Sequence, residues 1–226
     1  MSPLEGGTAG RIRRGGSAVG PSPHWRRVET RFPAPKEVRN VKVKVVGFIG
    51  SPRVDGNTDR MVEWVLEAAM EEGAEVECVA LREKRIAPCK ACETCAKPPH
   101  RCATQDDMED IQALLSQAQG IVLGTPVYWW GPSAQMKAFV DRWYGFRGDH
   151  RGTVRGKKFG LVVALGDSDV STARHVVGMF KDALNYLDCD LHEPVLAPGC
   201  ASPDDVERMP QVRTKCRELG KWLAST

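Results

Sequence analysis

Apolar residues recur along the chain as short continuous runs that alternate with helically spaced sets, starting at residue 43. The first run, VKVVGFIG at 43–50, is apolar on both alternations, which is typical of a strand covered by helices on both faces of a parallel sheet. Met61, Trp64 and Val65 follow at helical spacing and predict a helix over about 57–72. The stretch therefore reads as strand, loop and helix.

The same alternation continues to the end of the chain. Further strands are predicted at 74–81, 120–124, 159–165 and 190–196. Further helices are predicted from Gln105 onward and at 133–144, 170–187 and 203–224. Five such repeats predict an α/β fold, a doubly wound five-stranded parallel sheet with helices on both faces. Ligands bind such sheets beyond the carboxyl ends of the strands, so we expect the loops 50–58, 125–133 and 166–170 to converge on one site.

Composition and charge divide the chain into a body at 41–226 and a basic tail at 1–40. The 226 residues are 42% hydrophobic and carry a net charge of +3, but the first 40 hold eight basic residues against three acidic ones. The body is therefore close to neutral, which argues against a nucleic-acid-binding core. The tail is rich in Gly, Pro and Ser and lacks apolar periodicity, so we expect disorder. A polyanion-binding arm, or a subunit contact anchored by Trp25 and Phe32, is the alternative.

The chain also lacks an apolar stretch that would serve as a secretion signal or span a membrane. We therefore expect a cytoplasmic protein with no membrane partner.

The loop after the first strand has the composition of a phosphate-binding loop. Gly56 allows close approach of the backbone, and the loop ends where a helix begins and free N–H groups point outward. Neither G-x-G-x-x-G nor G-x-x-x-x-G-K-[ST] is present, so a terminal monophosphate is the remaining candidate. A turn that merely caps the helix is the alternative. The candidate phosphate-binding residues are Ser51, Arg53, Gly56, Asn57 and Thr58.

Three consecutive aromatic residues follow the strand predicted at 120–124, in the stretch TPVYWWGPS. Large aromatic side chains on the ligand-binding edge of a sheet favour a planar partner, because aromatic faces are satisfied by stacking. A core or subunit-contact role is the alternative. Together with a monophosphate loop, this aromatic wall indicates a flavin mononucleotide (FMN) site.

Several motifs in the same order resemble the flavodoxin-like NAD(P)H-dependent FMN reductases, within them the iron-sulfur flavoprotein branch. They are GSPRVDGNT, PCKACETC with a further Cys, DDM, and GTPVYWWGPSAQMKAFVDRW, and the resemblance covers roughly residues 42–200. The resemblance implies that the phosphate-binding residues named above hold the FMN phosphate. It also implies an isoalloxazine ring held by Pro126, Val127, Tyr128, Trp129, Trp130 and, nearby, Ser133.

A cysteine-rich insertion at 86–104 interrupts the repeats. Its spacing is C-x2-C-x2-C-x6-C, formed by Cys89, Cys92, Cys95 and Cys102. Three thiolates at three-residue spacing can surround one face of a cubane and a fourth can complete it, so the set suits a [4Fe–4S] cluster. Zinc and an empty set of thiols are the alternatives. The other cysteines are interpreted as buried or incidental thiols: Cys78, Cys189, Cys200 and Cys216.

We therefore expect an FMN-dependent oxidoreductase that passes electrons from NAD(P)H or reduced ferredoxin to an acceptor, with a [4Fe–4S] cluster converting two-electron into one-electron transfer. The alternatives are a cluster-free FMN or quinone reductase and a non-enzymatic flavodoxin-like electron carrier. No catalytic protein side chain is predicted, because N5 of the flavin carries the chemistry. A homodimer or homotetramer is the expected assembly.

Overall fold

The structure, a computed structural model, describes residues 42–225, so the predicted tail at 1–40 lies outside the described residues. The strands are β1 (Lys44–Ile49), β2 (Glu75–Ala80), β3 (Gly120–Tyr128), β4 (Gly131–Pro132), β5 (Lys158–Ala164), β6 (Asp190–Leu191) and β7 (Val195–Ala197). The helices are α1 (Asn57–Glu71), α2 (Met108–Gln117), α3 (Ala134–Asp141), α4 (Arg174–Tyr186) and α5 (Pro210–Ala224). Short 3-10 turns cover 81–83, 94–96, 142–146, 148–153, 170–173 and 205–208.

The central sheet is parallel, with the order β2-β1-β3-β5-β6. This is the flavodoxin-like order, in which the direction of winding reverses between β1 and β3. Loops that follow these two strands therefore meet at the carboxyl edge of the sheet, and this edge is the expected ligand site. The predicted flavodoxin-like fold class is confirmed.

The sheet has seven strands, so the predicted count of five is wrong. The segment predicted as one strand at 190–196 is broken into β6 and β7, which pair with opposite ends of β5. Pro194 lies in the break and has no N–H to donate to the sheet. The other addition is β4, two residues that fold back antiparallel on the extended end of β3.

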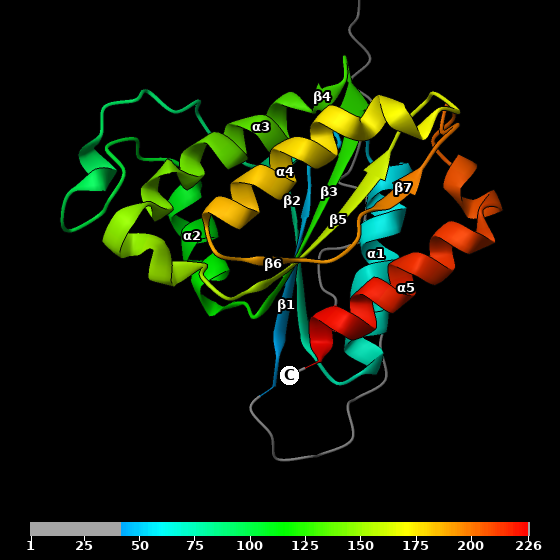
Figure 1. Ribbon diagram of the computed structural model, residues 1–226, viewed down its shortest axis with the longest axis horizontal. Coiled ribbons are helices and arrows are strands. Elements are labelled where there is room, and N and C mark those ends of the chain that lie inside the picture. Colours follow the sequence, from blue (N-terminus) through cyan, green and yellow to red (C-terminus); the bar gives the residue numbers. More distant parts are fainter. Residues whose placement is uncertain (1–41, 226) are drawn as a thin grey trace, which may run out of the picture. The chain divides into compact units, whose positions relative to one another are not determined.

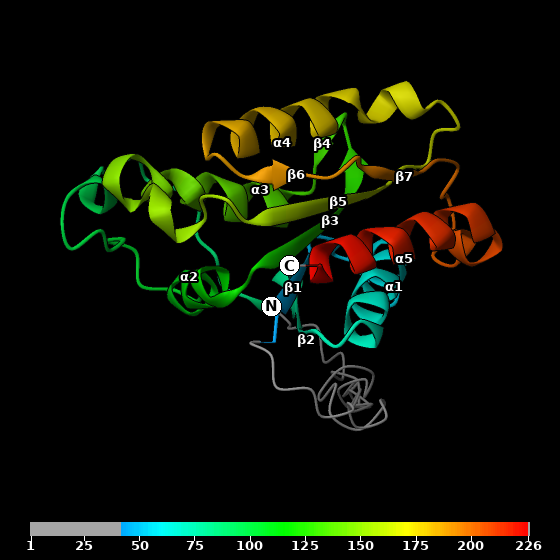
Figure 2. The ribbon, with the colours of Figure 1, turned by 60° about the horizontal axis from the view of Figure 1, so that its bottom comes forward.

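Two apolar layers cover the sheet, one on each face. Residues of β1 alternate between them: Val46 and Phe48 pack in the layer with α2, α3 and α4, whereas Val45 and Ile49 pack in the layer with α1 and α5. Figures 1 and 2 show these two sets of helices on opposite faces of the sheet. The continuous apolar run at 43–50 is explained by this double burial.

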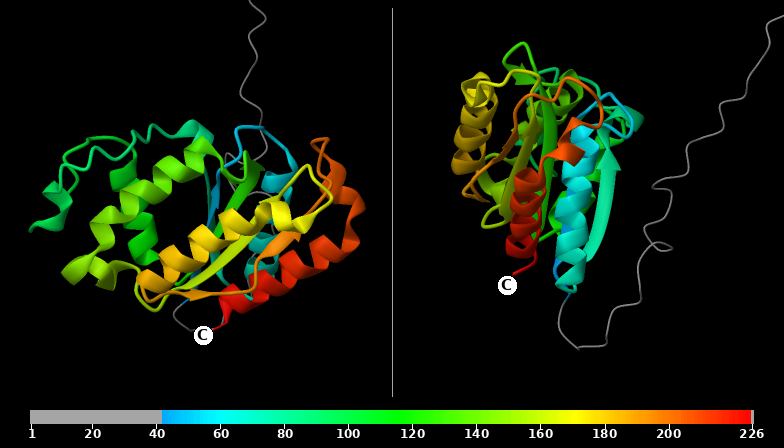
Figure 3. Two further views of the ribbon diagram at one scale, coloured as in Figure 1. Left: turned by 45° about the horizontal axis from the view of Figure 1, so that its top comes forward. Right: turned by 90° about the vertical axis from the view of Figure 1, so that its right-hand side faces the viewer.

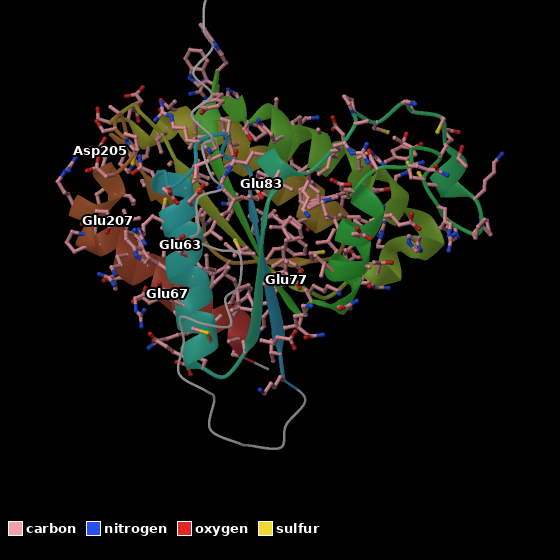
Figure 4. All side chains as sticks on the ribbon, turned by 180° about the vertical axis from the view of Figure 1, so that it is seen from behind. Glu63, Glu67, Glu77, Glu83, Asp205 and Glu207 are labelled. Carbon is pink, nitrogen blue, oxygen red and sulfur yellow. The ribbon has the colours of Figure 1, made fainter. Side chains whose placement is uncertain are left out.

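The β2 edge of the sheet carries carboxylates. Lys44 Nζ pairs with Glu77 Oε2 at 2.9 Å, and Glu63 and Glu67 lie on the neighbouring helix α1 (Figure 4). Charged side chains at a free edge oppose pairing with another sheet. Within residues 42–225, no helix is both long and apolar enough to cross a membrane.

Candidate functional site

The loop between β1 and α1 surrounds an uncapped helix N-terminus. Gly56 is the N-cap residue of α1, and no side chain caps the first turn. Backbone N–H groups of that turn are thus left for a ligand, and the helix dipole favours an anion there. Ser51 and Thr58 are buried beside this end of α1, whereas Arg53 is exposed.

A cavity of about 260 Å³ lies over this helix end, at the carboxyl edge of the sheet. Its lining brings the phosphate-loop residues together with part of the aromatic loop: Ser51, Arg53, Gly56, Asn57, Thr58, Pro126, Val127, Tyr128, Ala164, Gly166, Cys200 and Ala201. The loops after β1, β3 and β5 therefore converge, as the sheet order requires. A fourth loop, after β7, contributes Cys200 and Ala201 and was not predicted.

A second cavity of about 210 Å³ shares Val127 and Gly166 with the first. Trp129 and Trp130 line it together with Asp167 of the loop after β5. The predicted aromatic residues are thereby divided between two neighbouring cavities.

The two tryptophans stand at the tip of the β3–β4 hairpin in a costly backbone conformation. Trp129 and Trp130 have φ of 49° and 59°, in the left-handed region that large side chains avoid. Trp129 is also 92% exposed. Residues held in sparsely populated backbone regions cluster at active sites, ligand clamps and switch regions.

Ser133, predicted to lie near the flavin ring, is fully buried and lines neither cavity. Its Oγ donates to Gly50 O at 2.5 Å and accepts from Met136 N, so it caps α3 and ties the β1 loop to the β3 loop. Its backbone N–H donates to Thr125 Oγ1 at 3.1 Å. The structure thus places Ser133 beneath the site.

Asn57 joins the phosphate loop to the loop after β7. Its Nδ2 donates to Ser202 O at 2.6 Å, and its Oδ1 accepts from Val206 N at 2.9 Å. Both polar ends of the amide are engaged within the protein. The Asn57 side chain therefore holds the loop after β7, the fourth loop that lines the cavity, in place.

A buried ion pair that sequence reasoning missed supports the phosphate loop from below. Arg82 Nη2 donates to Asp59 Oδ2 at 2.8 Å, and Arg82 Nη1 donates to Ser51 O at 3.3 Å. Asp55 N also donates to Asp59 Oδ2, at 3.1 Å. Burial raises the pKa of Asp59, and Arg82 acts against that rise. The sequence signal for this pair is weak: Asp59 stands just before the apolar residues of the first predicted helix, and Arg82 stands just after the strand predicted at 74–81.

The insertion at 86–104 extends from the body at the end opposite to α5 (Figures 1 and 3). Cys89 and Cys92 are exposed, and Cys95 and Cys102 are half-buried. Burial raises the pKa of Cys95, and the charges of the other three thiols add to that rise because they lie near it. Thr94 Oγ1 donates to Cys92 Sγ at 3.5 Å and lowers the pKa of that thiol.

These thiols fit a metal centre in their chemistry, because four of them belong to one loop, with the other three near Cys95. Two of the four, Cys92 and Cys102, accept hydrogen bonds from O–H and N–H groups. Their arrangement is not that of a formed site. Within residues 42–225, no three His, Cys, Asp or Glu side chains are placed so as to hold a metal ion.

Residues 43–191 match the family described as NADPH-dependent FMN reductase. An iron-sulfur flavoprotein of Archaeoglobus fulgidus is 31% identical to the chain over 183 residues, which are 78% of this chain and 80% of that protein. An iron-sulfur flavoprotein of Methanocaldococcus jannaschii is 44% identical over 100 residues, which are 44% of this chain and 51% of that protein. The chain thus matches about half the length of the second relative.

Solved structures share the fold at lower identity. The Trp repressor binding protein from Bacillus subtilis superposes with a TM-score of 0.61 at 24% identity, over 78% of this chain and 99% of that one. An FMN-dependent NADH-azoreductase from Bacillus anthracis, solved in complex with FMN, superposes with a TM-score of 0.64 at 17% identity, over 80% of this chain and 100% of that one.

Proposed function

The chain belongs to the NADPH-dependent FMN reductase family, in its iron-sulfur flavoprotein branch, and on this premise we propose that it passes electrons from NAD(P)H or reduced ferredoxin through FMN to an acceptor. Membership makes the protein an FMN-dependent NAD(P)H oxidoreductase, and the family predicted from the sequence motifs is confirmed. The particular donor and acceptor, the site residues and a [4Fe–4S] cluster are the proposal.

One observation carries the proposal for the flavin. The uncapped N-terminus of α1 and the start of the aromatic loop line the same cavity, of about 260 Å³. An anion site next to apolar and aromatic side chains matches a ligand with a phosphate at one end and a planar ring at the other. FMN has this form.

Each group of residues has a separate task in binding FMN. Ser51, Thr58 and the first-turn N–H groups of α1 would hold the phosphate, and Arg53 would add a positive charge. Pro126, Val127 and the three aromatic residues after them would hold the ring. Asn57 would also donate to the phosphate with the second N–H of its Nδ2, while its Oδ1 and the first N–H hold the loop after β7.

When bound, FMN supplies the redox chemistry, since it takes two electrons as hydride and can release them singly. The side chains at the cavity orient the ring and shield part of it from water. We propose no acid or base among these side chains, because the bound flavin would itself supply the hydride chemistry.

We further propose that Cys89, Cys92, Cys95 and Cys102 bind one [4Fe–4S] cluster, which accepts one electron at a time. The support is the number, spacing and proximity of the thiols, together with the names of the relatives. A cluster-free FMN or quinone reductase is the second candidate. It is favoured by the exposure of Cys89 and Cys92 and by the lack of a formed metal site among the described residues.

Anaerobic purification with a visible spectrum tests both proposals. We expect flavin bands that bleach with NADPH or NADH, and close to four iron and four sulfide per chain after reconstitution. Cys92→Ala should lose most of the iron and keep the flavin, whereas Cys78→Ala, the matched control outside the insertion, should keep both. Iron-free protein with full one-electron activity would leave the cluster-free reductase.

A further inference from the structure

One buried guanidinium joins the cysteine-rich insertion to the body of the domain. Arg142 directly follows α3, and its side chain is 2% exposed. A buried cation requires compensating partners, so its contacts show what this position is built to hold.

The partners of Arg142 come from both ends of the insertion. Its Nη1 donates to Ala87 O at 3.0 Å, and its Nη2 donates to Thr104 O at 3.5 Å. Both nitrogens donate to the carboxylate of Asp106, at 2.6 and 3.1 Å. Asp106 in turn accepts from Ala87 N at 2.9 Å and from Met108 N at 3.2 Å. The start and the end of the insertion are thus fixed to one ion pair.

Arg142 also reaches one of the four thiols of the insertion. Its Nη2 donates to Cys102 Sγ at 3.3 Å, and Thr104 N donates to the same sulfur at 3.5 Å. Cys89 and Cys92, in contrast, are exposed. The insertion therefore contains one thiol, Cys102, that is bound to the body through Arg142, and two thiols that are exposed.

We propose that Arg142 is the positioning residue of the cysteine centre. It presets Cys102 as the fixed ligand, and the more exposed thiols close around the metal when it binds. This inference rests on the proposed function, because it assigns a role toward the proposed cluster. It also explains how the insertion can form a metal site although its thiols are not arranged as one. Both ends of the insertion and one ligand, Cys102, are already held in place, so metal binding needs to order only the segment between the two ends.

The physical effect of Arg142 on a bound cluster has a definite direction. Hydrogen bonds to cluster sulfurs are one of the factors that set the reduction potential, and a cationic donor stabilises the more negative, reduced state. Loss of an outer-shell partner of a metal ligand typically costs roughly 10- to 100-fold in metal affinity. A purely structural arginine would leave the potential unchanged.

The test compares Arg142→Gln with Lys137→Gln in the full chain, so that each variant loses one positive charge. Lys137 is exposed on α3 and pairs with Asp141, so its loss changes the charge nearby without touching the insertion. In metal-free protein we expect faster amide hydrogen exchange over residues 87–106 in Arg142→Gln alone. After anaerobic loading with ferrous iron and sulfide, we expect roughly 10- to 100-fold weaker retention of iron against a chelator and a more negative cluster potential.

A charge-free double variant, Arg142→Met with Asp106→Leu, guards against misfolding, because replacing both members of a buried pair with apolar residues is often tolerated. It should bind FMN normally and still show the weakened iron retention and the shifted potential. Wild-type potential and iron retention in this variant would overturn the inference while leaving the cluster itself intact. A wild-type chain that takes up no iron would instead overturn the cluster proposal, and the role of Arg142 toward a metal with it.

Discussion

At the scale of single residues, the predicted phosphate-binding loop between β1 and α1 depends on a buried ion pair that binds its backbone. Asp59 and Arg82 have side chains 5% and 8% exposed, and together they bind Ser51 O and Asp55 N, near the two ends of the loop. The loop can therefore hold its backbone N–H groups in place before a ligand arrives. Such preorganisation increases affinity because less freedom is lost on binding.

Removing Arg82 should damage both stability and binding. We expect Arg82→Ala to lower the free energy of unfolding by roughly 3–5 kcal/mol, because the carboxylate of Asp59 is left buried without its cation. Arg208→Ala, which breaks exposed pairs with Asp204 and Asp205, should cost under about 1 kcal/mol. Chemical denaturation of the two variants measures the difference, and equal losses would show that the buried pair has no special role.

The variants Ser51→Ala and Asn57→Ala should differ in their effect on the free energy of unfolding. Ser51→Ala should weaken FMN binding roughly ten- to a hundred-fold, the effect of one charge-assisted hydrogen bond, with little change in unfolding. Asn57→Ala should also destabilise the fold by about 1–3 kcal/mol, because Val206 N loses its partner in a buried position. Fluorescence titration and denaturation of each variant separate the two effects. If Asn57→Ala alters affinity alone, the tie to the loop after β7 is unimportant.

At the scale of elements, α1 and α5 pack so closely that one position accepts only glycine. A Cβ added at Gly220 would lie 2.1 Å from Val65 O and 2.9 Å from Ala68 Cβ. Val65 and Ala68 belong to α1, which begins at the β1–α1 loop. The close contact with Gly220 therefore also helps to fix the position of that loop relative to the sheet.

Alanine substitutions at two helical glycines should therefore change the stability of the protein in opposite directions. Gly220→Ala should destabilise the protein by roughly 1–3 kcal/mol, since backbone atoms must move apart. Gly178→Ala, in α4 and with no atom within 4 Å of the added Cβ, should stabilise it by roughly 0.5–1 kcal/mol through helix propensity. Thermal unfolding of both variants is the measurement, and the same sign in both would contradict the packing described.

Most elements could be predicted from the sequence because their apolar patterns are local. The strand, loop and helix at 43–72 are of this kind, and so is the convergence of the three strand-end loops. The split between β6 and β7 is caused by Pro194, which is visible in the sequence. The polar residues His192 and Glu193 directly before the proline are a second signal that the strand is broken there. The contacts of Asn57 with Ser202 and of Arg82 with Asp59 could not be predicted, since they join segments distant in the chain.

At the scale of the whole molecule, the two proposed sites occupy different parts of the chain's described residues. The cavity proposed to bind FMN lies at the carboxyl edge of the sheet, and the insertion extends from the body at the end opposite to α5 (Figure 3). Separate supports hold them: Asp59 with Arg82 for the first, and Asp106 with Arg142 for the second. Flavin binding and metal binding should therefore be separable by mutation.

The tail at 1–40 lies outside the described residues, and its independence from the body stays a prediction. Deleting residues 1–38 should leave the melting temperature and the flavin content nearly unchanged, because the tail has no apolar face to bury. Calorimetry and the visible spectrum of the shortened chain test this. A large loss of stability, or dissociation of an oligomer, would show that Trp25 and Phe32 are anchors.

The central claim is that the cavity over the N-terminus of α1 binds FMN through its phosphate. The most direct test is a fluorescence titration of flavin-free protein with FMN and with riboflavin, which has the same ring and no phosphate. Two charge-assisted hydrogen bonds at the helix end already predict at least about a 100-fold preference for FMN. Equal affinity for the two flavins would contradict the account.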